Sequence, residues 1–461
     1  MLTDKPCDEE RAFELCPLEQ AQGTYAIIQN SLLYSSMQLG CKGGAPLLAA
    51  IQSAFERLLE LYPILRGHQV QLPTGNIIST AADSSKPGPL FETCEAPEMT
   101  VSEFAKVKFH CDQWPAAINE ALKKRTADLE RLIAGTVTRF ADGYLVTLSV
   151  NHIVADGAAI FLLLRQWASL AKNSTLLPEL PIDFDHPAFW AKLTAHPQDT
   201  HPLVDYVKSK DFGDLSAIQA KLNTLYATGS LDGSQTLNMR VLHVSPAAIE
   251  AIGKAFNTEA ALQSGYPAIH GAQILYALLW QRYVAAVVEM HAESETAYTL
   301  PIFLTMMYGL RSITPAPDYI GNAVGSVIVP CETRDVLSMP TIDLARLIKE
   351  HLGKITPGTV VHYLNEAFGG DGSFLVKNIY LFARTESRIS ISNRSRLAFF
   401  DIDFGHGKPI ALLNGTRPVD GLASWMPGRD GGIDIHYGLK DDIYAVLKRD
   451  SILREFVEFV N

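Results

Sequence analysis

The chain has few of the features that mark secreted or membrane-spanning proteins. Its six cysteines are scattered among 461 residues without a C-x-x-C pair, which predicts reduced thiols rather than a disulfide framework. Residues 1–11 are charged and contain no apolar core for a signal peptide. The longest apolar run, at 158–164, stops at Arg165 and is too short to cross a bilayer. These absences predict a cytoplasmic protein with no membrane partner.

An excess of basic residues is also absent. The chain has 39 Lys and Arg against 50 Asp and Glu, a formal net charge of -11. A surface that binds the phosphates of a nucleic acid needs the opposite balance. We therefore expect no nucleic-acid partner.

The motifs of several enzyme classes are missing as well. There is no G-x-S-x-G for a hydrolase, and G-H-G-K at 405–408 lacks the glycine spacing of a phosphate loop. D-F-G at 403–405 matches the kinase triplet, but neither a glycine-rich loop nor H-R-D precedes it. The best metal candidates are H-C-D at 110–112 and His152 with Asp156, yet no two histidines have the spacing H-x-x-x-H. We predict no metal.

What the chain does have is enough material for two hydrophobic cores. Its length of 461 residues exceeds what one core usually supports, and 47% of the residues are hydrophobic. A long connection is marked by prolines at 178, 181, 187, 197 and 202. We therefore expect an N-terminal domain at 1–190, a crossover segment at 191–236 and a C-terminal domain at 237–461.

Hydrophobic periodicity predicts an α/β organisation in both halves. The expected helices are at 46–61, 158–171, 246–256, 269–288, 341–352 and 441–460. The expected strands are at 132–140, 144–150, 240–244, 326–329, 378–382 and 432–437. Trp280, among apolar neighbours on the helix at 269–288, is predicted to belong to the core rather than to contact a ligand.

One histidine stands where functional groups are commonly displayed. In S-V-N-H-I-V-A-D-G at 149–157, His152 follows an apolar strand and a helix begins just beyond Gly157, so the motif lies in a strand-loop-helix connection. Because the pKa of imidazole is near neutrality, this side chain can accept a proton and return it within one turnover. The same pattern also fits a buried histidine that hydrogen-bonds a backbone carbonyl, and the motif alone does not decide between them.

Six short segments form an ordered series along the chain. H-x-x-x-D-G is provided by His152, Asp156 and Gly157, and D-F-G-H-G stands at 403–407. The other four are L-C-P-L-E-Q at 15–20, Y-P-I-L-R-G at 62–67, A-L-L-W at 277–280 and Y-I-G-N-A-V at 319–324. This series resembles the BAHD superfamily of acyl-CoA-dependent acyltransferases, in which the second signature is D-F-G-W-G. The ending W-M-P at 425–427 is more similar to the fungal branch that includes trichothecene 3-O-acetyltransferase than to the plant enzymes.

The resemblance implies a fold and a reaction. The fold is α/β, with two chloramphenicol-acetyltransferase-like domains, each a mixed β-sheet with flanking helices, joined by the crossover segment. The reaction is direct acyl transfer in a ternary complex, with His152 as the general base that removes a proton from an acceptor hydroxyl or amine. Acyl-CoA is then a co-substrate, and neither a cofactor nor an acyl-enzyme is needed. Because members of the resembled family are mostly monomers, we also expect a monomer.

Asp156 and Gly157 are expected to hold the loop rather than to react. In the resembled family this aspartate points away from the histidine and pairs with an arginine, for which Arg311 is the best match in this chain. The alternative is that Asp156 orients His152, as in a catalytic triad.

The later motifs suggest further roles. Asp403, Gly405 and Gly407 permit a sharp turn, which in the family shapes the far side of the CoA channel without performing chemistry. Asn322 is expected either to hold a turn or to contact acyl-CoA. The histidine at 406, where the family has tryptophan, leaves the fold prediction unchanged.

S-N-R at 392–394 aligns with the family's T-S-W, whose residues line the reaction centre. We expect Ser392 to stabilise the tetrahedral oxyanion. Arg394 is expected to face solvent, with selection of an acidic or polar acceptor as the alternative.

Three functions remain open at this point. The first is acyl-CoA-dependent O-acylation of a fungal secondary-metabolite alcohol, with acetyl as the donor. The second is N-acylation of an amine or use of a carrier-protein thioester, as in condensation domains, which often have a second histidine where Asn151 stands. The third is a catalytically silent scaffold that binds a metabolite or a protein.

Overall fold

The computed structural model describes fifteen stretches of the chain, and every structural statement below concerns them: 11–15, 27–35, 44–72, 75–108, 113–128, 130–172, 185–195, 197, 199, 237–258, 267–290, 301–312, 318–368, 389–415 and 418–460. The predicted strand at 378–382, most of the crossover segment, the H-C-D triplet at 110–112 and all but the first residue of the motif at 15–20 lie outside the described residues.

The chain divides into two compact units that interleave along the sequence. The first unit combines Met1–Leu193 with Thr314–Ala323 and Leu397–Thr416. The second combines Thr194–Ile313, Val324–Arg396 and Arg417–Asn461. This division differs from the contiguous domains expected at 1–190 and 237–461, because two short pieces of the later chain belong to the first unit.

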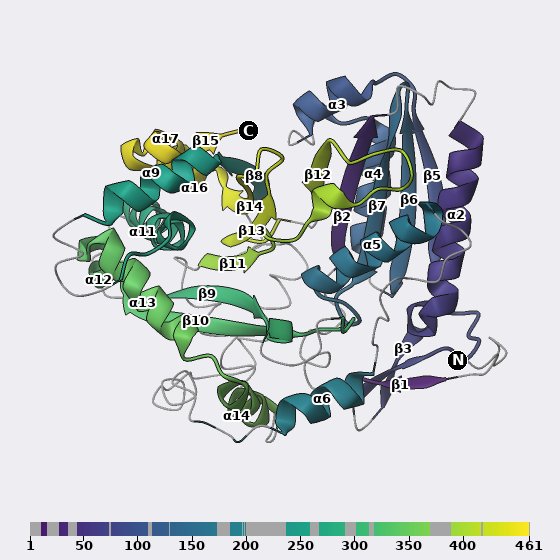
Figure 1. Cartoon of the computed structure of the whole chain (residues 1–461), viewed down its shortest axis with the longest axis horizontal. Coiled ribbons are helices and arrows are strands. Elements are labelled where there is room, and N and C mark those ends of the chain that lie inside the picture. Colours follow the sequence, from purple (N-terminus) through teal and green to yellow (C-terminus); the bar gives the residue numbers. More distant parts are fainter. Residues whose placement is uncertain are drawn as a thin grey trace. The chain divides into compact units, whose positions relative to one another are not determined.

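The first unit is built on a five-stranded mixed sheet (Figure 1). Its order is β12 (Ala411–Asn414), β2 (Ile27–Ser35), β7 (Gly143–Asn151), β6 (Ile133–Phe140) and β5 (Leu90–Ala96). Only the β5 and β6 pair is parallel. A separate three-stranded sheet has the order β1 (Ala12–Glu14), β4 (Gly75–Ser79) and β3 (His68–Leu72). Strand β7, which leads to His152, therefore has a hydrogen-bonded neighbour on each side.

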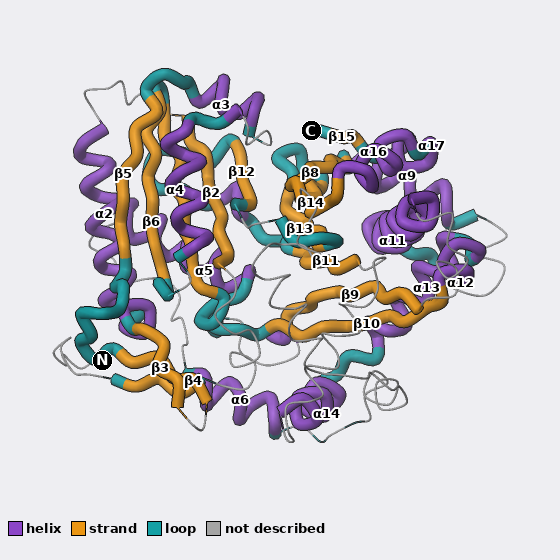
Figure 2. Tube along the Cα trace, turned by 180° about the vertical axis from the view of Figure 1, so that it is seen from behind, coloured by secondary structure: helices purple, strands orange, loops and turns teal. Residues whose placement is uncertain are grey.

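Helices cover both faces of the five-stranded sheet. On one face α2 (Gly44–Leu61) packs against α5 (Gly157–Lys172), and Phe55 and Trp167 meet over Gly135 of β6 because glycine leaves room for the two rings. Figure 2, seen from behind, shows α4 (Ala116–Ala127) on the other face. There a buried cluster joins the sheet to α4 and to α3 (Val101–Val107), which begins with a capping box of Thr100 and Glu103. The 3₁₀ turns η1 (Pro63–Arg66) and η5 (Phe399–Asp401) and the helix α6 (His186–Thr194) complete the unit.

The second unit contains a seven-stranded mixed sheet. Its order is β10 (Val324–Glu332), β9 (Pro301–Gly309), β11 (Ile389–Asn393), β13 (Leu422–Pro427), β14 (Ile433–Lys440), β8 (Leu237–Val244) and β15 (Glu458–Phe459). Strand β11 is parallel to both neighbours, and the other pairs are antiparallel. Both large sheets are thus mixed, as the sequence resemblance predicts.

One helix lies at the centre of the second unit's helical layer. The helix α11 (Gly271–Met290) contacts α9 (Pro246–Phe256), α12 (Thr333–Ser338), α13 (Thr341–Gly353), α16 (Asp441–Arg449) and α17 (Ser451–Phe456). These helices gather on one side of the sheet (Figure 1), and α14 (Pro357–Phe368) and the turn η4 (Leu310–Ser312) follow elsewhere in the unit. Trp280 of α11 is 0% exposed in this core, which confirms its predicted structural role.

Most predicted elements are confirmed within a few residues, but the last one is wrong. The helix expected at 441–460 is two helices, α16 and α17, followed by the short strand β15. Asp450 causes the break, because its carboxylate accepts the backbone N–H groups of Ile452 and Leu453 and starts a new helix there. None of the helices in the described stretches combines the length and apolarity that crossing a membrane requires.

Candidate active site

His152 follows the last residue of β7, as the strand pattern predicts. The Asn151 side chain closes the turn, since its Oδ1 accepts the N–H of Ile153 at 3.0 Å, and the Asn151 carbonyl accepts the N–H of Val154 at 3.1 Å. Ile153 and Val154 are fully buried, whereas His152 is only half-buried. The turn thus anchors its apolar residues in the core and leaves the imidazole partly accessible.

Asp156 is fully buried and its carboxylate is occupied by backbone amides. Its Oδ1 accepts the N–H groups of Ala158 at 3.0 Å and Ala159 at 2.8 Å, which caps the N-terminus of α5. Its Oδ2 accepts the N–H of Ala323 at 2.9 Å, and its own N–H donates to the carbonyl of Gly321 at 3.3 Å. Asp156 therefore fixes α5, which starts at Gly157, to the segment 321–323.

That segment brings Asn322 to His152. Asn322 is fully buried, and its amide nitrogen donates to the carbonyls of His152 at 2.6 Å and Ile153 at 3.2 Å. Its Oδ1 lies 2.9 Å from His152 Nδ1. The two carbonyl partners determine which end of the amide is nitrogen, because a carbonyl can only accept.

This arrangement selects one tautomer of the imidazole. An amide oxygen can only accept, so His152 Nδ1 must carry the hydrogen that it donates to Asn322. In the neutral ring the lone pair is then on Nε2, which is the nitrogen that can take a proton from another group. The site can therefore perform acid-base chemistry at Nε2 of His152.

Sequence reasoning missed this role of Asn322, for which it offered a turn or a contact with acyl-CoA. The only sequence signal is the G-N pair within the block at 319–324, and the partner histidine is 170 positions away. No local pattern reports a contact over that separation.

The 403–407 motif lies at the other end of α5. Asp403 Oδ2 pairs with Nζ of Lys172, the last residue of α5, at 2.7 Å, while Oδ1 accepts the N–H groups of Gly405 at 2.7 Å and Gly407 at 2.9 Å. Both glycines have positive φ, +104° and +100°, a region that L side chains rarely adopt. The side chain at 406 is exposed. Since α5 has 16 residues, this motif is about 24 Å along the helix from Asp156.

The environment of Asp403 favours its charged form. Burial by itself raises the pKa of this carboxyl group, but the hydrogen bonds from Lys172, Gly405 and Gly407 outweigh burial. The net result is a pKa below the ordinary value. Phe404 is buried and packs edge-on against Trp167 of α5, with ring centroids 5.3 Å apart. The motif thus binds to α5 through both an ion pair and an aromatic contact.

The remaining predicted residues belong to the second unit. Arg311 lies in η4 and is half-buried, and Ser392 lies on β11 opposite Ser424 and Met307. The pairing of Asp156 with Arg311 and the oxyanion role of Ser392 stay predictions. The expectation that Arg394 faces solvent is wrong, because this side chain is only 9% exposed.

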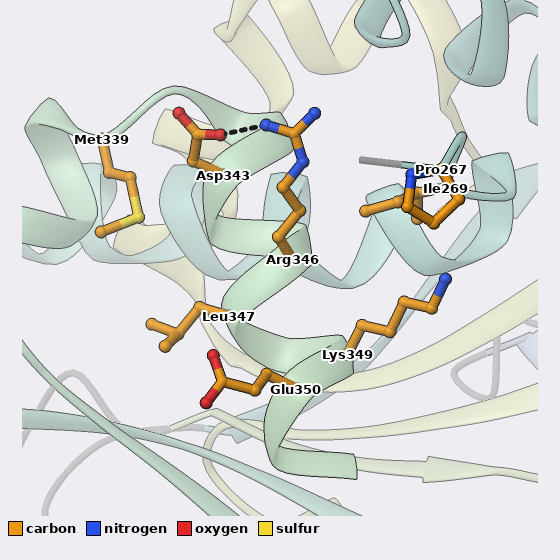
Figure 3. Close-up of a pocket in the computed structure, with 8 residues that line it drawn as sticks. All are labelled: Pro267, Ile269, Met339, Asp343, Arg346, Leu347, Lys349 and Glu350. Carbon is orange, nitrogen blue, oxygen red and sulfur yellow. Dashed lines mark hydrogen bonds and ion pairs between the residues drawn. The ribbon is translucent and has the colours of Figure 1, made fainter. Parts of the chain in front are cut away.

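A pocket of about 520 Å³ opens on α13 of the second unit (Figure 3). Three of its four ionic side chains are paired locally, with Arg346 donating to Asp343 at 2.6 Å and Glu350 lying 2.7 Å from Lys354, and the fourth is Lys349. The rest of its lining is mainly apolar, and it contains none of the predicted site residues. We assign this pocket no part in the reaction.

Metal-binding side chains do not converge in the part of the chain that the structure describes, where no three His, Cys, Asp or Glu residues are grouped suitably for an ion.

Comparisons with known proteins agree with the motif series. The family model described as the Transferase family matches residues 52–451. Among curated proteins, the chain is 24% identical to agmatine hydroxycinnamoyltransferase 1 of Oryza sativa subsp. japonica over 315 residues, which are 66% of each protein.

Solved structures extend the likeness to the whole fold. TRI101 of F. graminearum, complexed with coenzyme A and T-2 mycotoxin, gives a TM-score of 0.73 at 15% identity and covers 98% of this chain and 100% of that chain. The first condensation domain of the CDA synthetase gives a TM-score of 0.56 at 13% identity, covering 95% of this chain and 94% of that one. At such identities the likeness establishes the fold, and it confirms the predicted two-domain α/β architecture with mixed sheets.

The family match extends over far more than half of the chain and includes both signature motifs. The chain therefore belongs to the Transferase family, the BAHD superfamily of acyltransferases, and is an enzyme that uses acyl-CoA as its co-substrate.

Proposed function

We propose that this enzyme transfers an acetyl group from acetyl-CoA to a hydroxyl of a fungal secondary metabolite, with His152 as the general base. The observation that carries the proposal is the hydrogen bond of 2.9 Å between His152 Nδ1 and Asn322 Oδ1, which leaves Nε2 as the basic nitrogen. Asn322 thus does for this imidazole what a triad carboxylate does elsewhere, since it fixes the tautomer and the ring orientation.

The proposed reaction is a direct displacement. Nε2 of His152 takes the proton of the acceptor hydroxyl as its oxygen attacks the thioester carbonyl carbon. The tetrahedral intermediate then expels the CoA thiolate, and the proton on His152 neutralises that leaving group. Asp156 keeps the base in place through α5 and segment 321–323, and no step requires it to exchange a proton.

Second-unit residues complete the proposal. We propose that Ser392 donates a hydrogen bond to the oxyanion and that Arg311 supports the loop through Asp156. Asp403, Gly405 and Gly407 are proposed to act structurally, through α5. The monomeric state and the cytoplasmic location predicted from the sequence stay part of the proposal, with size-exclusion chromatography and fractionation of the source cells as their tests.

The hydroxyl acceptor is supported by the fold. The TRI101 structure, which contains coenzyme A and T-2 mycotoxin, covers nearly the whole of this chain. The branch-specific ending at 425–427 supports the same group of acceptors. The fungal secondary-metabolite alcohol is therefore our first choice of substrate class.

N-acylation is a second candidate that one comparison favours. The curated relative at 24% identity is named for agmatine, an amine acceptor, and for a hydroxycinnamoyl donor. The same base would serve, because an ammonium group must lose a proton before its nitrogen can attack a thioester. Transfer from a carrier-protein thioester is less well supported, since Asn151 closes the turn here and no second histidine stands at that position.

The test is acceptor-dependent release of free thiol from acetyl-CoA, measured for purified protein against a panel of fungal alcohols and amines. We expect release with an alcohol, and a fall of about 10²- to 10⁴-fold for His152→Ala. His68→Ala, which removes another half-buried histidine in β3, is the matched control and should retain turnover.

Two results would count against the proposal. Normal turnover of a folded His152→Ala protein would exclude the general base, and release with amines alone would replace the O-acyl acceptor by an amine. If no thiol is released with any acceptor, titration calorimetry with CoA separates a silent scaffold, which would not bind CoA, from an enzyme whose acceptor or acyl donor is missing from the panel.

A further inference from the structure

The segment that carries Asn322 is itself held by a buried tyrosine. Tyr319, three residues before Asn322, is 0% exposed. Its ring stacks on Phe189 of α6, with centroids 4.1 Å apart and planes 8° from parallel. The contact joins two parts of the first unit that are distant in sequence.

The hydroxyl end of the ring lies against Gly321. A methyl group at Gly321 would overlap the Tyr319 hydroxyl and the adjoining ring carbons. The ring therefore packs against Phe189 and against the backbone of its own segment. A displaced ring would displace Gly321, whose carbonyl accepts the N–H of Asp156.

The hydroxyl of Tyr319 is also fixed. It shares a hydrogen bond of 2.6 Å with Nδ1 of His186, a side chain only 1% exposed, and the two rings meet edge to face with centroids 5.6 Å apart. His186 is the first residue of α6, and Asp185 caps that helix by accepting the N–H of Ala188 at 2.8 Å. Since α6 begins at His186, the cap fixes the backbone from which the imidazole extends.

We propose that His186 and Phe189 are positioning residues for the transfer reaction. They hold Tyr319, Tyr319 sets the place of segment 321–323, and Asn322 of that segment orients the imidazole of His152. The inference rests on the proposed role of His152. It gives α6 a part in positioning that base, although α6 lies outside all six sequence motifs.

The test combines three substitutions with a matched control. His186→Phe keeps a ring but removes the hydrogen bond, Tyr319→Phe removes only the hydroxyl, and His186→Asn restores an amide near the place of Nδ1. The control is Thr147→Val on β7, the strand that leads to His152, and it removes a buried hydrogen bond of 2.8 Å to Ser31 of β2. It measures the effect of a lost buried hydrogen bond that has no connection to Asn322.

We expect His186→Phe and Tyr319→Phe each to lower kcat by about 10-fold or more, with the KM for acyl-CoA unchanged, because misplacing a reacting group costs rate. The double variant should be no worse than either single one, since both remove the same contact. His186→Asn should recover part of the rate, and Thr147→Val should keep the full rate. In an Asn322→Ala background, His186→Phe should have no further effect on kcat.

A different pattern would overturn the inference. If both variants lower the thermal unfolding midpoint as Thr147→Val does and leave kcat unchanged, α6 is only part of the core. A full His186→Phe effect in the Asn322→Ala background would show that His186 does not act through Asn322. Failure of the general-base proposal is separable, since it would appear as retained turnover in His152→Ala whatever the His186 variants do.

Discussion

Two signature segments of the first unit hold the two ends of the same helix, and they do so differently. The segment 319–323 binds the start of α5 through Asp156, with Tyr319, Asn322 and Ala323 all 0% exposed. The segment 403–407 binds the end of α5 through Lys172, with Asp403 partly exposed, Phe404 buried and residues 405–407 open to solvent. The segment 319–323 therefore lies in the core, and most of the segment 403–407 lies at the surface.

The contacts of these two segments indicate that a carboxylate in a signature motif need not be a reacting group. Asp156 and Asp403 each accept backbone N–H groups, but Asp156 fixes the start of α5 by accepting the helix's own amides, whereas Asp403 fixes its end through the ion pair with Lys172. The group that reaches the imidazole is the neutral amide of Asn322. We therefore expect substitutions near the start of α5 to change turnover and those near its end to change mainly stability.

Asn322→Ala should have the largest effect. It removes the acceptor of His152 Nδ1 and the donor to two carbonyls, so the imidazole loses its fixed tautomer. We expect kcat to fall by about 10²-fold, because a misplaced reacting group, here the imidazole of His152, costs a rate factor of that order. Steady-state kinetics measures this, with Asn414→Ala, a buried asparagine of β12, as the control. An equal fall of kcat in both variants would show that the loss of any buried asparagine, rather than the loss of the contact with His152, lowers turnover.

Asp156→Asn should lower stability and turnover together. Asparagine has only one acceptor oxygen. If this oxygen caps α5, the amide nitrogen faces the N–H of Ala323, where only an acceptor fits. We expect a loss of about 2 kcal/mol in the free energy of unfolding, measured in denaturant. Lost turnover with unchanged stability would instead favour an orienting role for Asp156.

Asp403→Asn should have the smallest effect. It removes the ion pair with Lys172 but keeps an oxygen for the glycine amides, so we expect a loss of about 0.5 to 1 kcal/mol at neutral pH with kcat nearly unchanged.

The pH dependence sharpens this last comparison. Because the folded-state pKa of Asp403 lies below its ordinary value of 3.8, its contribution is present above that value and is lost as the pH falls through the folded pKa. Wild type should therefore lose more stability than Asp403→Asn between neutral pH and pH 3. Parallel stability curves for the two proteins in acid would contradict the assigned environment of Asp403.

Much of the fold could be predicted from hydrophobic periodicity, because long buried helices and strands keep a constant period. The helix at 246–256 is observed with the same bounds, and α5 differs from the expected range by one residue at each end. The two short pieces that join the first unit, 318–323 and 397–415, could not be assigned, since periodicity does not tell which sheet a strand such as β12 joins. The final helix failed because one side chain, Asp450, interrupts an amphipathic pattern that continues on both sides.

The site was predictable only where the chemistry is local. His152 and Asp156 lie four positions apart on one turn, so a motif identifies them together. The partners of His152 and Tyr319, namely Asn322 and His186, come from 170 and 133 positions away, and only the fold brings them close. Arg394 was misjudged because charged side chains usually face solvent, and burial is a property of the tertiary structure.

The central claim, that Asn322 holds His152 with the hydrogen on Nδ1 and the lone pair on Nε2, can be measured without a substrate. Protein with ¹⁵N-labelled imidazoles would be compared by NMR with a His152→Gln variant, which identifies the resonances of His152 among those of the 13 histidines. The account predicts that neutral His152 is protonated on Nδ1, and that Asn322→Ala produces a mixture of tautomers. A neutral ring protonated on Nε2 in the wild-type enzyme would contradict it.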